Sequence, residues 1–176
     1  MPTIFCSKKL STLLKINKNQ HVIHDKTDAW NGHLFYLLKR KCLIFIHKQT
    51  LYSFVMLDIF KKDMADFNMV FVENYIMQLQ ADSILPSTYE NQIRERYKNI
   101  MLLPTDNDRK VIGSINDCVF RIKYYGTHRV ETLRDANQYI GQHLNETPMG
   151  AVGYKHPKDL MREKINQEYH HKDHGR

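Results

Sequence analysis

The strongest hydrophobic pattern of the chain lies between residues 33 and 59. Three short segments rich in apolar and aromatic residues follow one another there: HLFYLL, CLIFI and LYSFVML. The polar breaks between them are only a few residues long, which predicts a three-stranded antiparallel meander. The middle segment is apolar at every position, so we expect it to be a central strand covered on both faces. The two turns, at 39–41 and 47–50, then lie at opposite ends of the meander.

The hydrophobic period changes on both sides of this meander. Ahead of it, PTIFC (2–6) has the alternation of a short strand, and Ser7 is a suitable N-cap for a short amphipathic helix over 8–16. After it, apolar residues recur every three or four positions, as on helices that cover a sheet. Such helices are predicted over 60–80, 87–97, 108–125, 130–144 and 158–169, with a further strand at 99–103. The stretches 17–29 and 145–157 predict loops.

The order of these elements predicts an α+β fold, in which a small antiparallel sheet with a three-stranded meander is covered by about five or six helices. We expect a single globular domain over residues 1–165 and a flexible C-terminal tail over 166–176. The chain has 176 residues, 42% hydrophobic and 26% charged, which is typical of a globular protein and excludes general disorder.

The cysteines and the apolar runs indicate the compartment. Cys6, Cys42 and Cys118 are odd in number and far apart, and no CxxC pair exists, so a zinc knuckle and a thioredoxin motif are excluded. We interpret all three as reduced core residues, which predicts a cytoplasmic location. The runs LIFI and FVML are far shorter than the roughly 20 apolar residues of a membrane-spanning helix, so no membrane association is expected.

Positive charge is concentrated at the start of the chain. The net charge is +7, and residues 1–50 hold nine Lys or Arg against two acids, which accounts for the whole excess. Lys8, Lys9, Lys39, Arg40 and Lys41, together with Lys48, are interleaved with Phe35, Tyr36 and Tyr52. Cations neutralise phosphates and exposed aromatic rings stack on bases, so the first five are candidate anion contacts. The alternative is a solvated basic face that aids solubility.

Two further sets of residues are candidates for a site. Trp30 and His33, at the entrance of the first meander strand, could line a pocket or stack on a base; the alternative is a packing role. Ser114, Asp117 and Arg121 share the predicted face of helix 108–125 opposite Ile112, Ile115, Val119 and Ile122, where they could hold a phosphate. An ordinary ion pair between Asp117 and Arg121 is the alternative.

Catalytic signatures are absent from the sequence. It has no GxGxxG, GxxxxGK[ST], HExxH or GxSxG motif, which weakens the dehydrogenase, P-loop, zincin and hydrolase interpretations. A lone nucleophile at Cys6 would need its pKa lowered by the neighbouring Lys8 and Lys9. We expect no cofactor, and the histidines near the C-terminus are not predicted to form a physiological metal site.

Several segments together resemble a known family. They are FCSKKL (5–10), the segment from Trp30 to Phe35, KRKCLIFIHKQTLYSFVML (39–57), IGSINDCVFRIKY (112–124) and LNETPMGAVGYKHP (144–157). The chain resembles, from about residue 3 to 165, an uncharacterised prokaryotic family that is a domain of unknown function. The resemblance implies a single domain and a bacterial cytoplasmic origin, and it brings no activity, cofactor or catalytic residue.

The preferred hypothesis is a non-enzymatic binding or regulatory module that contacts an anionic partner such as nucleic acid. One alternative is an accessory protein that interacts with another protein. The other is a small enzyme with a polar pocket near Ser114, Asp117 and Arg121, joined by Trp30 and His33.

Overall fold

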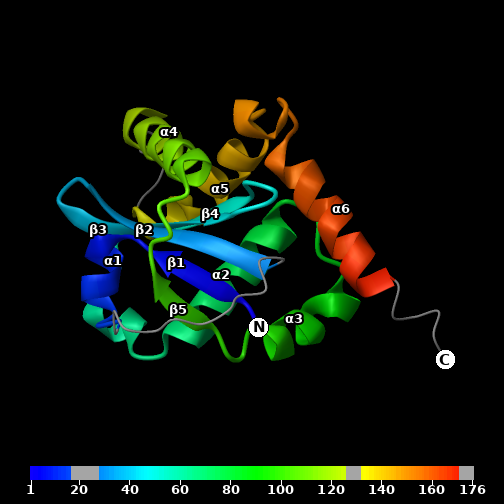
Figure 1. The fold of residues 1–176 in the computed structure, drawn as a ribbon, viewed down its shortest axis with the longest axis horizontal. Helices are drawn as coiled ribbons and strands as arrows, with labels where there is room; N and C mark the ends of the chain where they lie inside the picture. The colour runs from blue at the N-terminus through cyan, green and yellow to red at the C-terminus, as the bar shows by residue number, and fades with distance from the viewer. Residues whose placement is uncertain (17–27, 126–131, 171–176) are drawn as a thin grey trace.

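The computed structural model describes residues 1–16, 28–125 and 132–170, and its centre is one mixed sheet of five strands in the order β4-β3-β2-β1-β5 (Figure 1). β2 (Ala29–Leu37), β3 (Arg40–His47) and β4 (Ser53–Met56) form the predicted antiparallel meander. β1 (Thr3–Cys6) pairs in parallel with β2 on one side and with β5 (Met101–Pro104) on the other. The α+β prediction is confirmed, and the sheet is mostly antiparallel.

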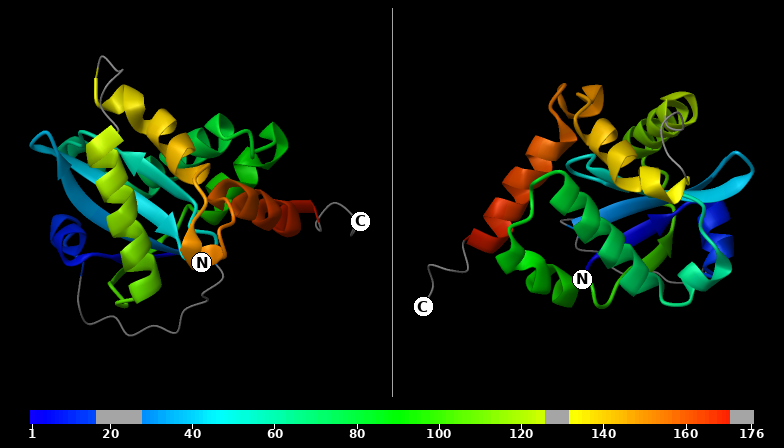
Figure 2. Two further views of the ribbon diagram at one scale, coloured as in Figure 1. Left: turned by 90° about the horizontal axis from the view of Figure 1, so that it is seen from above. Right: turned by 180° about the vertical axis from the view of Figure 1, so that it is seen from behind.

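Helices cover both faces of this sheet (Figures 1 and 2). α1 (Lys8–Leu13), α2 (Phe67–Ala81), α3 (Glu90–Arg96) and α6 (Pro157–His170) contribute to the core of one face. α4 (Arg109–Tyr125) and α5 (Asn137–Asn145) cover the other face. Short 3-10 turns lie at Lys61–Met64, Ser87–Tyr89, Arg134–Ala136 and Gly150–Val152. Every predicted helix is present, but the helices predicted over 60–80 and 130–144 begin seven residues later, at Phe67 and Asn137.

The chain end differs from the prediction. α6 continues to His170, and Ile165 and Tyr169 are buried in the core shared with α2 and α3. The predicted boundary between domain and tail at residue 165 thus falls inside a helix. The prediction missed this because most residues of the helix are charged and its apolar stripe is short. Residues 171–176, like the polar stretch 17–27, lie outside the described residues.

Trp30 is the centre of an aromatic core. Its ring is fully buried and meets the rings of Phe54, Phe71 and Tyr75 edge to face, with centroids 5.0–5.6 Å apart. Its indole N–H donates to the Tyr97 hydroxyl at 3.0 Å, which satisfies the one polar group of the side chain. The candidate role of Trp30 in stacking on a base or lining a ligand pocket is therefore wrong, and the packing alternative is right.

The β2–β3 hairpin projects beyond the rest of the sheet as an arm, seen at the upper left of Figure 1. The pairing of β1 with β2 ends at Gly32, whereas β2 pairs with β3 as far as Leu37 and Arg40. The two-residue loop consists of Leu38 and Lys39, both with positive φ (48° and 64°). A two-residue loop with two positive φ values is a type I′ turn, which Asn and Gly usually occupy. This turn is strained, because residues other than glycine usually avoid positive φ.

Candidate functional site

Lys8 and Lys9 stand in the first turn of α1, directly after the end of β1. Ser7 caps this turn, its Oγ accepting a hydrogen bond from the Leu10 amide at 3.4 Å, and the buried Leu10 side chain fixes the helix on the sheet. Both lysines point away from that core and are exposed. The Lys9 ammonium nitrogen lies 6.0 Å from the centroid of the Tyr36 ring on the β2–β3 arm. This contact joins the start of α1 to the arm.

The tip of the arm carries three more cations. Lys39, Arg40 and Lys41 are exposed, and Arg40 lies 3.8 Å from the Asp58 carboxylate. Lys8, Lys9, Lys39 and Lys41 have no ion-pair partner among the residues that the structure describes. Their charges are therefore available to an external anion.

His33 lies on the opposite face of β2 from Tyr36, the face that α4 covers. It is half-buried on β2, and its pKa is lowered by burial first and then by the positive charges of Lys9 and Lys123. Its ring is therefore neutral at pH 7, and both lysines lie within its electrostatic reach. We call the set Lys8, Lys9, Tyr36, Lys39, Arg40 and Lys41 the basic surface. Sequence reasoning missed Lys123, an exposed cation on α4, which covers the other face of the sheet.

Two exposed aromatic rings flank Lys123 on α4. Phe120 and Tyr124 are 61% and 67% exposed, and their rings stack with centroids 5.6 Å apart and planes at 27°. Their spacing of one helical turn places both on the solvent side of α4. The sequence contained a signal for them, since two aromatics at i and i+4 lie off the apolar stripe of this helix. We call them the aromatic pair.

Lys48 does not belong to the basic surface. It lies in the turn at the other end of the meander, where it forms ion pairs with Asp106 and with Asp108. The prediction that the two turns of the meander lie at opposite ends is confirmed by the strand register. Lys48 is neutralised locally and offers no charge to a partner.

The predicted polar face of α4 is partly wrong. Ser114 is only 6% exposed, and its hydroxyl donates to the Lys110 carbonyl at 3.0 Å, whereas Ile112 reaches the surface. Asp117 and Arg121 form an ion pair at 2.9 Å, as the alternative proposed. Trp30 belongs to the core on the opposite face of the sheet from Ser114, so the predicted enzyme pocket joining them is not formed.

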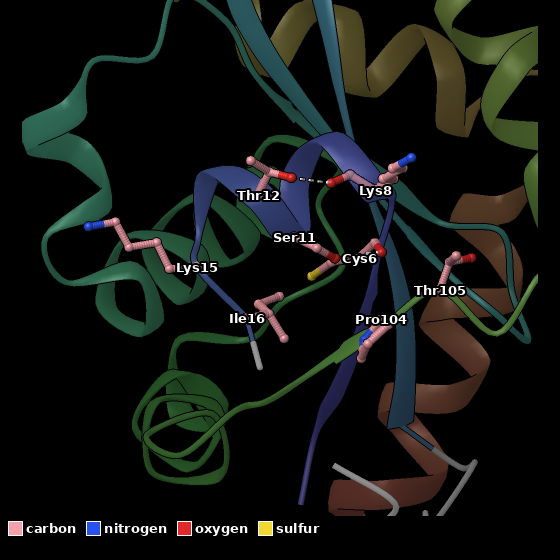
Figure 3. A pocket seen from close by; sticks show the side chains of 8 residues that line it. All are labelled: Cys6, Lys8, Ser11, Thr12, Lys15, Ile16, Pro104 and Thr105. Atoms are coloured by element: carbon pink, nitrogen blue, oxygen red, sulfur yellow. Dashed lines mark hydrogen bonds between the residues drawn. The ribbon is translucent and has the colours of Figure 1, made fainter. Parts of the chain in front are cut away.

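A crevice opens beside Lys8, where β1 and β5 end (Figure 3). It measures about 530 Å³, and its lining consists of Cys6, Lys8, Ser11, Thr12, Lys15, Ile16, Pro104 and Thr105. Burial raises the pKa of the Cys6 thiol to about 12. The thiol is therefore protonated at neutral pH, and the hypothesis of a nucleophile with a lowered pKa is wrong.

Comparison with known proteins assigns the chain to a family. The model of the family described as "Domain of unknown function (DUF6933)" matches residues 3–160, so the chain belongs to this family. No curated protein matches the sequence. Within the described residues, no helix has the length and apolar character needed to cross a membrane.

Proposed function

We propose that this member of the DUF6933 family is a non-enzymatic binding module that holds single-stranded nucleic acid on its basic surface. The observation that carries the proposal is the contact between Lys9 and Tyr36, which joins the cations of α1 to those of the arm. As part of the same proposal, the protein acts in the bacterial cytoplasm, where single-stranded nucleic acid is present.

The charges of the basic surface favour a polyanion. Lys8, Lys9, Lys39 and Lys41 lack carboxylate partners among the described residues, and a phosphate backbone supplies closely spaced negative charges. Each phosphate that a cation neutralises releases a condensed counterion, so binding is expected to weaken steeply with salt. If four phosphates are neutralised on a single strand, log K should fall with log salt at a slope of about −3.

The aromatic pair favours a single strand over a duplex. Phe120 and Tyr124 offer ring faces on which unpaired bases can stack, and each such contact contributes about 1–3 kcal/mol. Bases within a duplex are already stacked, so the pair would gain nothing from them. Lys123 lies between the two rings in the sequence, so a cation accompanies the pair on the same helix.

A second candidate function is docking to an acidic protein. Leu38, at the tip of the arm, is 69% exposed between cationic neighbours, as a residue that enters an apolar pocket of a partner would be. An acidic protein that bound through Leu38 would lose affinity in Leu38→Asp. Nucleic-acid binding should change little in that variant beyond the loss of one unit of net charge.

Charge reversal on the arm tests the proposed function. Lys39→Glu with Arg40→Glu should weaken binding of a labelled single-stranded oligonucleotide more than tenfold at low salt, measured by fluorescence anisotropy. The matched control is Lys98→Glu with Lys155→Glu, which changes the net charge equally at exposed positions away from the arm. Equal loss of binding in both double variants would mean that only net charge matters, and the proposed surface would be wrong.

A further inference from the structure

The crevice of Figure 3 lies at a point where the chain leaves two neighbouring parallel strands in opposite directions. After β1 the chain enters α1, which packs on one face of the sheet, and after β5 it continues to α4, which packs on the other. Such a divergence at the carboxyl ends of parallel strands opens a crevice where α/β proteins bind ligands. Its volume of about 530 Å³ falls within the usual range for small-molecule sites.

The interior of the crevice is apolar and the rim is cationic. Ile16 and Pro104 supply hydrocarbon surface, and the fully buried, uncharged Cys6 thiol lies beneath them. Lys8 and Lys15 stand at the rim with their ammonium groups pointing outward in Figure 3. Among the residues that the structure describes, none of those lining the crevice carries a carboxylate. A ligand with an apolar body and a negatively charged group at its outer end would match this distribution of apolar and cationic residues.

The hydroxyl groups define where that negative group would lie. Ser11 and Thr12 donate their hydroxyl protons to the carbonyls of Cys6 and Lys8, at 3.1 and 3.0 Å. Thr105 differs, because its Oγ1 accepts from the Asn107 amide at 3.1 Å and its own proton is left to donate. A hydroxyl donor and the flexible Lys8 ammonium thus line the same opening.

We propose that the crevice is a separate binding site for a small aromatic anion. The flat body of the ligand lies against Ile16 and Pro104, above the buried Cys6, and its phosphate or carboxylate accepts hydrogen bonds from Thr105 and Lys8. This site shares Lys8 with the basic surface but otherwise goes beyond the proposed nucleic-acid function, since its remaining residues lie at the ends of β1 and β5 and around α1, and neither the arm nor the aromatic pair takes part.

Three matched probes test the proposal: 2-naphthoate, 2-naphthyl phosphate and the neutral 2-naphthylmethanol. Each is titrated into the full chain and followed by amide NMR. We expect at least one anion to shift the amide signals of Cys6, Ile16 and Thr105 and to bind at least fivefold more tightly than the alcohol. Whichever of the two anions binds more tightly shows whether the site prefers a phosphate or a carboxylate ligand. Absence of shifts at these residues up to millimolar probe, or equal binding of the alcohol, would overturn the proposal.

Two variants localise the binding. Thr105→Phe fills the opening and should abolish binding of the anions, whereas Thr88→Phe makes the same change at an exposed position of the turn before α3 and should leave binding intact. Lys8→Gln keeps the crevice open, so it provides a second measurement should Thr105→Phe fail to fold. This variant should bind the anions several-fold more weakly and bind the alcohol with unchanged affinity. Undiminished anion binding in Lys8→Gln would contradict the proposed site.

Discussion

The ammonium group of Lys9 lies 6.0 Å from the ring centroid of Tyr36, so the first turn of α1 contacts the β2–β3 arm. The two residues are far apart in sequence. Lys9 is one of the α1 cations, and Tyr36 pairs in register with Lys41, one of the cations of the arm. Their contact depends on the parallel pairing of β1 with β2, which places the start of α1 beside the free edge of β2. One surface results, where the sequence suggested separate clusters.

The aromatic pair should set the preference for single strands. Phe120→Ser with Tyr124→Ser is expected to weaken single-strand binding by about tenfold or more, since each stacked base is worth about 1–3 kcal/mol. Duplex binding should change little. Fluorescence anisotropy with matched single- and double-stranded oligonucleotides measures both.

Tyr139→Ser with Tyr154→Ser is the control for this prediction, because these rings are also exposed but lie elsewhere. If the two double variants lose affinity equally, the aromatic pair has no special role. The preference for single strands would then need another origin. The charge-reversal experiment on the arm tests a different part of the proposal and would not be affected by this result.

The strained turn of the arm should be open to stabilisation. Leu38→Asn with Lys39→Gly places at the two positive-φ positions the residues that type I′ turns prefer, and stability should rise by about 1–2 kcal/mol. Urea unfolding followed by circular dichroism provides the measurement. Leu38→Ala retains the unfavourable φ and should not stabilise the protein; a gain of the same size there would show that the exposed leucine, and not the backbone, causes the strain.

Gly141 and Gly113 should respond in opposite directions to alanine. A Cβ at Gly141 would lie 1.9 Å from Oε1 of Gln78, whose amide nitrogen is fixed by hydrogen bonds to Asp82 and to the Gln138 carbonyl. Gly141→Ala is therefore expected to destabilise the fold by about 1–3 kcal/mol. At Gly113 a Cβ would meet nothing within 4 Å, so Gly113→Ala should stabilise α4 by about 1 kcal/mol. Thermal unfolding gives the melting temperature of each variant. A shift of the same sign in both variants would contradict this packing.

The buried Asp82 carboxyl group should make stability depend on pH. Its Oδ2 accepts from Tyr52, Gln78 and Asn145 at 2.5, 3.2 and 3.0 Å, but burial is the largest effect and raises the pKa above the ordinary value. The folded state thus retains this proton at pH values where the unfolded chain has lost it.

The sign of the effect follows from this difference in protons bound. The contribution of Asp82 to stability is greatest below the unfolded pKa near 4 and falls as pH rises through the raised folded pKa. Relative to Asp82→Asn, the wild type should lose stability between about pH 4 and neutrality. Urea unfolding of both proteins across this range gives the difference directly, and a wild type that gains stability relative to Asp82→Asn as pH rises would show that the carboxyl pKa is not raised.

The sequence predicted the meander because alternating and continuous apolar runs are local signals. It could not reveal that β1 lies between β2 and β5, because parallel pairing depends on contacts remote in the chain. The arm's turn was predicted at 39–41 but lies at Leu38 and Lys39, because these two residues adopt a positive-φ conformation that their residue types usually avoid.

The candidate site was predicted in part. Lys8, Lys9, Lys39, Arg40 and Lys41 were identified from local charge, and the structure shows them exposed. Ser114 was assigned to the wrong face of α4 because the apolar stripe was counted from Ile112 and not from Val111, which is buried. The aromatic pair could have been found from its i, i+4 spacing off the apolar stripe, whereas the crevice depends on how elements pack and no local pattern could have located it.

The most direct test of the central claim is the affinity of the wild-type protein for labelled single-stranded and duplex oligonucleotides as a function of salt. The account predicts single-strand binding that exceeds duplex binding and weakens steeply as salt rises, with a slope of about −3 for four neutralised phosphates. No binding at low salt, or binding insensitive to salt, would contradict it.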